Sequence, residues 1–266
     1  LAKDELERVM LSDTRVMGVG GLRFLHDGRV VICTTQQRKV PDEEWGKSCL
    51  VLHTWAGDES EVECFFQPFS HISETSLLTF DDAERFAAIG QPQGVDVYAV
   101  PARGEPWPEP QRVRIADEPT RAYTRTAISP DGEHVAWCDD WSAPLACFVR
   151  SDGTVRWRHP PENEGRSQLR FTPDSSVVAI QVGRRDSVSR RVQFFAVEDG
   201  AVRHEQLTEA TRESRCFAFH PSGGCLAVGS AAGNVRLFAY HEAKLIVDVQ
   251  VLASGYVSAL EFSRDG

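Results

Sequence analysis

Long apolar runs are missing from this 266-residue sequence. No stretch approaches the ~20 apolar residues of a membrane-spanning helix, so no such span and no membrane partner are expected. Basic residues are also scarce: 29 Lys and Arg stand against 39 Asp and Glu, which gives a net charge of −10. Because nucleic-acid binding needs a basic surface, this balance argues against nucleic acid as a partner.

Local motifs for catalysis, metals and cofactors are absent as well. The eight His form no H-x-H or H-E-x-x-H pair, no two of the seven Cys are spaced C-x-x-C, and G-x-S-x-G does not occur. We therefore predict no catalytic residue, no metal site and no cofactor. Most Cys lie in apolar runs, where buried free thiols are favoured over disulfides or metal ligands, and reduced thiols fit the cytoplasm.

Lysine and asparagine are rare, with Lys at four positions and Asn at two. Such usage is typical of GC-rich coding sequence and indicates a bacterial source. It carries no information about function.

A short turn pattern recurs along the chain at intervals of 56, 48, 43, 48 and 43 residues. Its clearest copies are Ile128-Ser-Pro-Asp-Gly132, Phe171-Thr-Pro-Asp-Ser175 and Phe219-His-Pro-Ser-Gly223; weaker copies begin at Phe24, Phe80 and Phe262. In a tight turn Pro fixes φ, Asp or Ser bonds to nearby backbone, and Gly tolerates positive φ. The repeats therefore predict a series of hairpins.

Each turn joins two short apolar runs, and a third apolar run and a more polar, alternating fourth run follow. In the fourth repeat these runs are 177–180, 192–197 and 201–207, after the first strand that ends at Phe171. Four strands repeated five times predict an all-β chain, a β-propeller of four-stranded antiparallel blades. A sixth blade begins with residues 256–262, so we expect further sequence to complete the ring.

These units resemble the blades of WD-repeat β-propellers. Residues 234–238 resemble the end of that family's third strand, with Phe238 where Trp is usual. The resemblance covers roughly residues 14–266, but no Trp-Asp dipeptide is present and no blade has the family's Gly-His pair before its first strand. The family's buried hydrogen-bond network is therefore not assigned to any residue.

Residues 1–13 have two interpretations. Counting back along the repeat places 6–11 where an outer strand would close the ring, as an N-terminal strand often does in this family. The spacing of Ala2, Leu6, Val9 and Met10 fits an amphipathic helix equally well.

Loops that gather on one face of a propeller supply the candidate binding residues. The loops between second and third strands carry two Trp and an Arg cluster, and loops between blades add other aromatic side chains. The candidates are Trp45, Trp141, Arg184, Arg185, Arg190, Arg191, Phe69, His71 and Tyr123. Trp, Tyr and Arg are enriched among interface residues that contribute most to binding. Two alternatives stay open: the Trp side chains cap the core, and the Arg cluster is a solvated hairpin.

The resemblance implies a non-catalytic scaffold that binds a protein or peptide on this loop face. A second hypothesis is the propeller portion of an enzyme, similar to prolyl-oligopeptidase-like peptidases or to lactonases. A third, nucleic-acid binding through the Arg hairpin, is disfavoured by the net charge.

Overall fold

A computed structural model of the chain describes residues 14–38, 48–56, 59–63, 68–69, 78–91, 93–116, 124–139, 144–160, 165–183, 190–263 and 265–266. It contains two compact units, residues 1–80 with 84–124 and residues 81–83 with 125–266. The segment 1–13, predicted as a helix or an outer strand, lies outside the described residues.

The first unit holds two antiparallel sheets. One is formed by β1 (Thr14–Phe24), β2 (Val30–Arg38), β3 (Ser48–Ala56) and β4 (Glu59–Glu63), with β5 (Pro68–Phe69) also paired to β3. The other is formed by β6 (Leu78–Phe80), β7 (Phe86–Gln91), β8 (Gly94–Ala99) and β9 (Gln111–Arg114). Leu25, Ile89, Tyr98 and Trp107 belong to the buried core of this unit.

The second unit holds three four-stranded antiparallel sheets, the third to fifth of the chain. The third contains β10 (Thr124–Ile128), β11 (His134–Asp139), β12 (Leu145–Val149) and β13 (Val155–His159). The fourth contains β14 (Gly165–Phe171), β15 (Val177–Gly183), β16 (Arg190–Ala196) and β17 (Val202–Arg203). The fifth contains β18 (Ser214–Phe219), β19 (Cys225–Ser230), β20 (Asn234–Ala239) and β21 (Lys244–Gln250).

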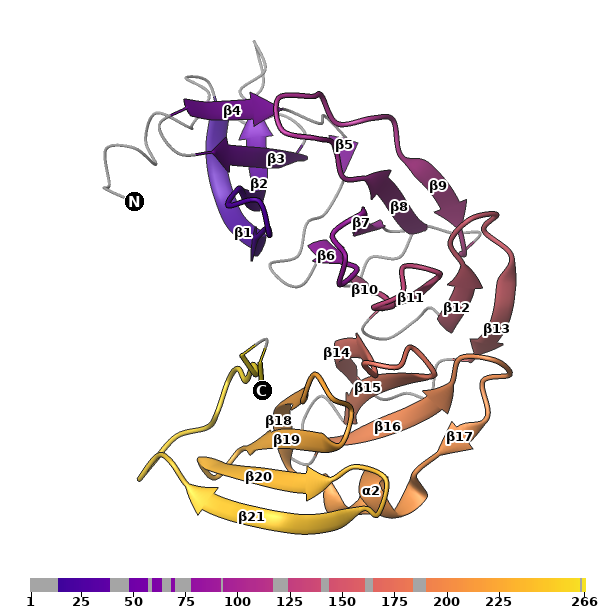
Figure 1. Ribbon diagram of the computed structural model, residues 1–266, viewed down its shortest axis with the longest axis vertical. Helices are drawn as coiled ribbons and strands as arrows, with labels where there is room; N and C mark the ends of the chain where they lie inside the picture. The colour runs from indigo at the N-terminus through magenta and orange to yellow at the C-terminus, as the bar shows by residue number, and fades with distance from the viewer. Residues whose placement is uncertain are drawn as a thin grey trace. The chain divides into compact units, whose positions relative to one another are not determined.

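Every sheet therefore follows the predicted order, with four strands adjacent in sequence and joined by hairpins (Figure 1). The second strand β15 is buried along its whole length, and β11 and β19 are buried except at their first residue, as their continuous apolar runs predict. The all-β prediction and the count of five complete blades are confirmed.

The predicted fourth strand of the fourth blade is wrong beyond Arg203. After His204, which has a left-handed φ of 52°, the chain forms helix α2 (Glu205–Ala210). This segment is rich in helix formers, and Leu207 is fully buried beside β16. Burial of that one side chain favours a helical turn over a longer edge strand.

The recurring turns have the predicted geometry. Their fifth position has positive φ throughout: Gly28, Glu84, Gly132, Ser175, Gly223 and Gly266. Asp131 accepts a hydrogen bond from Ser129 Oγ at 2.5 Å and from Glu133 N at 2.9 Å. Asp174 accepts the matching bonds from Thr172 Oγ1 at 2.6 Å and Ser176 N at 3.1 Å. Side-chain hydrogen bonds between residues two apart thus shape these two turns.

Residues 256–262, predicted as the first strand of a sixth blade, form no assigned strand. A first strand is defined by pairing with a second strand, and the described chain provides none for this segment. The segment nevertheless contacts the fifth sheet: Val257 N donates to Ser230 O at 3.1 Å, and the Phe262 ring lies 5.1 Å from the His220 ring.

Candidate partner-binding surface

Consecutive sheets of the second unit are joined through their first strands. Arg125 Nε donates to Ser167 O at 2.7 Å, which links β10 to β14. The amide of Gln168 exchanges two hydrogen bonds with the backbone of Phe217, which links β14 to β18. At the other end, Asp131 N donates to Ser175 Oγ at 3.2 Å. The first strands therefore run side by side in the same direction.

This arrangement gives the second unit two distinct edges. At one, the start edge, the first and third strands begin and the second and fourth strands end. At the other, the turn edge, lie the recurring turns around Asp131, Asp174 and Ser222. Because every sheet is antiparallel in chain order, segments that join second to third strands always leave from the start edge.

Of the predicted binding residues, Arg190 and Arg191 lie at the start edge. They open β16, are half-buried, and pair through their backbones with Gly183 and Val182. Phe69 lies in β5, where its backbone pairs with Ser48. The others lie outside the described residues, and their placement stays a prediction: Trp45, His71, Tyr123, Trp141, Arg184 and Arg185.

The structure adds two start-edge residues that sequence reasoning missed. The Arg215 guanidinium lies 5.3 Å from the centre of the Tyr256 ring, a cation–π contact. Tyr256 is 58% exposed. Tyr256 could have been predicted from the sequence, because it follows Ser254 and Gly255 in a loop after an apolar strand. An aromatic residue in such a loop is a candidate contact residue.

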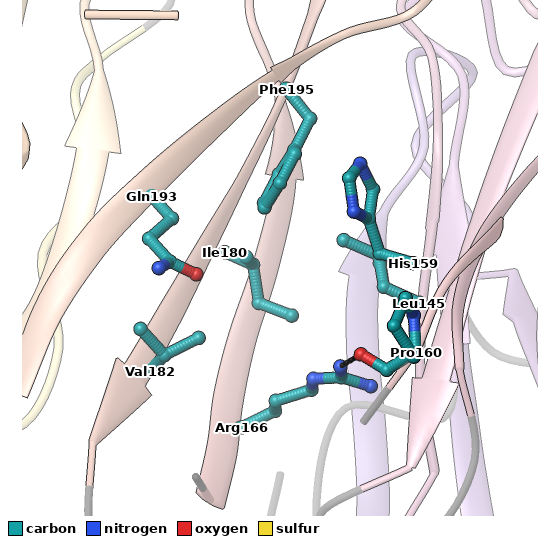
Figure 2. A pocket seen from close by; sticks show the side chains of 8 residues that line it. All are labelled: Leu145, His159, Pro160, Arg166, Ile180, Val182, Gln193 and Phe195. Atoms are coloured by element: carbon teal, nitrogen blue, oxygen red, sulfur yellow. Dashed lines mark hydrogen bonds between the residues drawn. The ribbon is translucent and has the colours of Figure 1, made fainter. Parts of the chain in front are cut away.

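A small pocket lies between the third and fourth sheets at the same edge (Figure 2). Its lining residues are Leu145, His159, Pro160, Arg166, Ile180, Val182, Gln193 and Phe195. Arg166 Nη2 donates to Pro160 O at 3.2 Å, and the His159 ring lies 4.5 Å from the Phe195 ring. Its free space accommodates about one water molecule, which makes it a packing gap rather than a ligand site.

The described cysteines match the prediction of free thiols. Cys138, Cys147 and Cys216 are buried, Cys225 is half-buried, and these four form no disulfide with one another. Burial raises the pKa of the Cys147 thiol to about 12, and burial also raises that of Cys216. Both thiols are therefore protonated and unreactive near neutral pH.

The described part of the chain lacks two features. It contains no group of three or more His, Cys, Asp or Glu side chains arranged to hold a metal ion. It also contains no helix with the length and apolar character needed to cross a membrane.

Comparison with known proteins supports the blade interpretation. No family model matches the chain. It is 27% identical over 140 residues to WD repeat-containing protein 1 of Gallus gallus, an alignment that spans 48% of this chain and 21% of the chicken protein.

Two solved structures share the fold at 13% sequence identity. One is the Cps50 (Swd1) β-propeller domain of Myceliophteria thermophila, with a TM-score of 0.53 over 72% of this chain and 59% of that one. The other belongs to the mitotic checkpoint complex, with a TM-score of 0.60 over 89% of this chain and 67% of that one. The repeated four-stranded sheets, the turn pattern and these likenesses support a β-propeller of WD-repeat-like blades as the fold of this chain.

Proposed function

We propose that this chain is a non-catalytic scaffold that binds a protein or peptide partner along the start edge. One of its structural neighbours is a chain of the mitotic checkpoint complex, which is a protein assembly by name. Propeller folds present a row of loops on a rigid frame, an arrangement suited to recognising an extended surface.

The observation that carries this proposal is the convergence of Arg and aromatic side chains on one edge. Arg190, Arg191, Arg215 and Tyr256 all lie at the start edge of the second unit. In sequence, Trp141 falls between the end of β11 and the start of β12, and Arg184 and Arg185 fall between β15 and β16. Those strand ends belong to the same edge.

Each residue type has a role in such an interface. An exposed aromatic ring such as Tyr256 supplies apolar contact area at a low cost in side-chain entropy, and the Arg side chains supply planar donors for carboxylates and backbone carbonyls. Arg215 also holds the Tyr256 ring from one side, which limits its rotamers. We therefore expect the partner to present an apolar side chain flanked by acidic or carbonyl groups.

The direct test is affinity capture with quantitative mass spectrometry. The baits are the wild-type chain, Trp45→Ala/Trp141→Ala, Arg215→Ala/Tyr256→Ala and Arg190→Glu/Arg191→Glu. Because truncating a central interface side chain costs about 2 kcal/mol, each pair should reduce capture of the partner by at least about tenfold.

A matched control is Arg156→Ala, which removes an exposed Arg near the beginning of the outer strand β13, toward the turn edge. It should capture the partner as the wild type does. Far-ultraviolet circular dichroism and thermal unfolding of each bait separate loss of binding from loss of fold. A capture profile that is identical for wild type and for all three double variants would contradict the proposal.

A further inference from the structure

The connection between the third and fourth strands of the second sheet is longer than its counterparts in the three sheets that follow. β8 ends at Ala99 and β9 begins at Gln111, so this connection covers residues 100–110 (Figure 1). The corresponding connections in the third, fourth and fifth sheets are 150–154, 197–201 and 240–243. Because hairpin loops usually have about two to five residues, a longer loop on a rigid fold is a candidate for a function of its own.

Proline alternates with other residues through the second half of this connection. Residues 105–110 have the sequence Glu-Pro-Trp-Pro-Glu-Pro. Each Pro has a φ fixed near about −65° and lacks a backbone N–H, and each residue before a Pro is restricted to extended or polyproline II backbone. The alternation therefore favours a polyproline II segment, and residues 106–110 are assigned to no helix or strand.

The fold holds this segment in place before, within and after its Pro residues. Before them, Arg29 Nη2 donates to Pro101 O at 2.9 Å, which ties the connection to the first sheet. Within the segment, Trp107 is 6% exposed and its indole contacts the Tyr98 ring edge-on, with the ring centres 6.0 Å apart. After them, Gln111 begins β9. A segment held in this way loses little conformational entropy when it binds a partner.

Exposure along the segment follows the threefold symmetry of polyproline II. With about three residues per turn, residues three apart share one edge of the helix. Trp107 is buried and Pro110 is half-buried, so the edge that they share faces the core. The other two edges are exposed, and each combines one Pro with one Glu: Glu105 with Pro108, and Pro106 with Glu109.

We infer that residues 105–110 are a binding segment for a protein domain that recognises polyproline II ligands in an aromatic groove. Such grooves pack aromatic rings against Pro and exploit the low entropy of the preformed helix. Because the exposed edges also carry Glu105 and Glu109, the rim of the matching groove carries Lys or Arg. This site belongs to the first unit and does not depend on the function proposed for the start edge of the second unit.

The test uses a panel of purified SH3 and WW domains with basic groove rims, each titrated against the full chain by isothermal titration calorimetry. At least one domain should bind the wild type. Pro106→Ala/Pro108→Ala removes the exposed rings and the backbone restriction, and it should weaken that binding at least about tenfold. Glu105→Gln/Glu109→Gln keeps the shape of the segment, and it should weaken binding at least about threefold and reduce its salt dependence.

A matched control is Pro221→Ala, which removes an exposed Pro from a recurring turn of the second unit and should bind as the wild type does. Thermal unfolding of each variant separates loss of binding from loss of fold, and both double variants keep the buried anchor Trp107. In the complex, the amides of Glu105, Trp107 and Glu109 should gain protection from hydrogen exchange. Absence of binding by every domain of the panel would overturn the inference. So would binding that either double variant retains at full strength, because the domain would then occupy another surface.

Discussion

The side-chain amide of Gln168 pairs with the backbone of Phe217 in the way that a neighbouring strand residue would. Gln168 Nε2 donates to Phe217 O at 2.9 Å, and Phe217 N donates to Gln168 Oε1 at 2.9 Å. Phe217 itself is fully buried in the core between the fourth and fifth sheets. One side chain thus fixes the register between two first strands that share no backbone ladder.

Replacing Gln168 should therefore loosen the junction between these two sheets. Gln168→Ala removes both hydrogen bonds and leaves the backbone amide and carbonyl of buried Phe217 without these partners, so we expect the free energy of unfolding to fall by about 1–3 kcal/mol. Urea denaturation followed by fluorescence measures this change. Gln206→Ala, at an exposed position of α2, is the control and should alter stability by less than about 0.5 kcal/mol. Equal stabilities of the two variants would show that the paired bonds contribute nothing.

Ser175 occupies a turn position where most copies of the repeat have glycine. Its φ is 61°, and its Oγ accepts a hydrogen bond from Asp131 N in the preceding blade. Ser175→Ala loses that bond but keeps the strained backbone, whereas Ser175→Gly loses the bond and relieves the strain. We expect the Gly variant to be more stable than the Ala variant by about 1 kcal/mol.

Thr154 is an exposed residue without positive φ, so the order of stability should be reversed there. We expect Thr154→Gly to be less stable than Thr154→Ala. Thermal unfolding of the four variants tests both orders together. If Ser175→Ala proves as stable as Ser175→Gly, the left-handed backbone at this turn does not limit stability.

The turn carboxylates should make the protein sensitive to acid. Burial on its own raises the pKa of Asp131, but hydrogen bonds from Ser129 and Glu133 outweigh it and hold the pKa below the ordinary 3.8. The same balance, with bonds from Thr172 and Ser176, lowers the pKa of Asp174. A depressed carboxylate pKa stabilises the fold above the unfolded value, and this contribution is lost as pH falls below about 4.

Urea midpoints measured from pH 6 to pH 3 check this dependence. The wild type should lose stability steeply in the acid range, and Asp131→Asn/Asp174→Asn should be less stable at pH 6 but flatter below it. Parallel curves for the two proteins would exclude the turn carboxylates as the cause.

Two histidines should make the stability of the fold depend on pH between about 5 and 7. Burial, with Arg156 nearby, lowers the pKa of His134 below 6.5, and burial followed by His241 and Arg203 lowers that of His204. The unfolded chain therefore binds more protons than the folded chain below pH 6.5, and stability should fall as pH drops from 7 to 5. His134→Gln/His204→Asn should reduce the change in the free energy of unfolding between pH 7 and pH 5. An unchanged pH dependence would show that these two histidines do not cause it.

The parts of the fold that depend on neighbouring residues were predictable from the sequence. The turns at Ile128 and Phe171 follow from Pro, Asp and Gly or Ser acting within a few residues, and the second strands follow from continuous apolar runs. The segment after Arg203 was not predictable in this way, because the burial of Leu207 against β16 is a tertiary contact that overrides strand periodicity.

The candidate site shows the same difference between features set by local sequence and features set by tertiary contacts. Arg190 and Arg191 were predicted in the loop before the third strand, and the structure has them as the first two residues of β16, at the edge where third strands begin. Tyr256 and Arg215 were missed because their contact joins a loop to β18 through space. The bonds of Gln168 were missed for the same reason, since no local pattern distinguishes them from those of an exposed glutamine.

The most direct test of the account is hydrogen exchange of the whole chain with and without the partner recovered by capture. If the start edge binds it, amides at 190–191, 212–215, 231–234 and 251–256 should gain protection, while the turn edge at 129–133, 172–176 and 220–224 should not change. Protection confined to the turn edge, or none at either edge, would contradict the central claim.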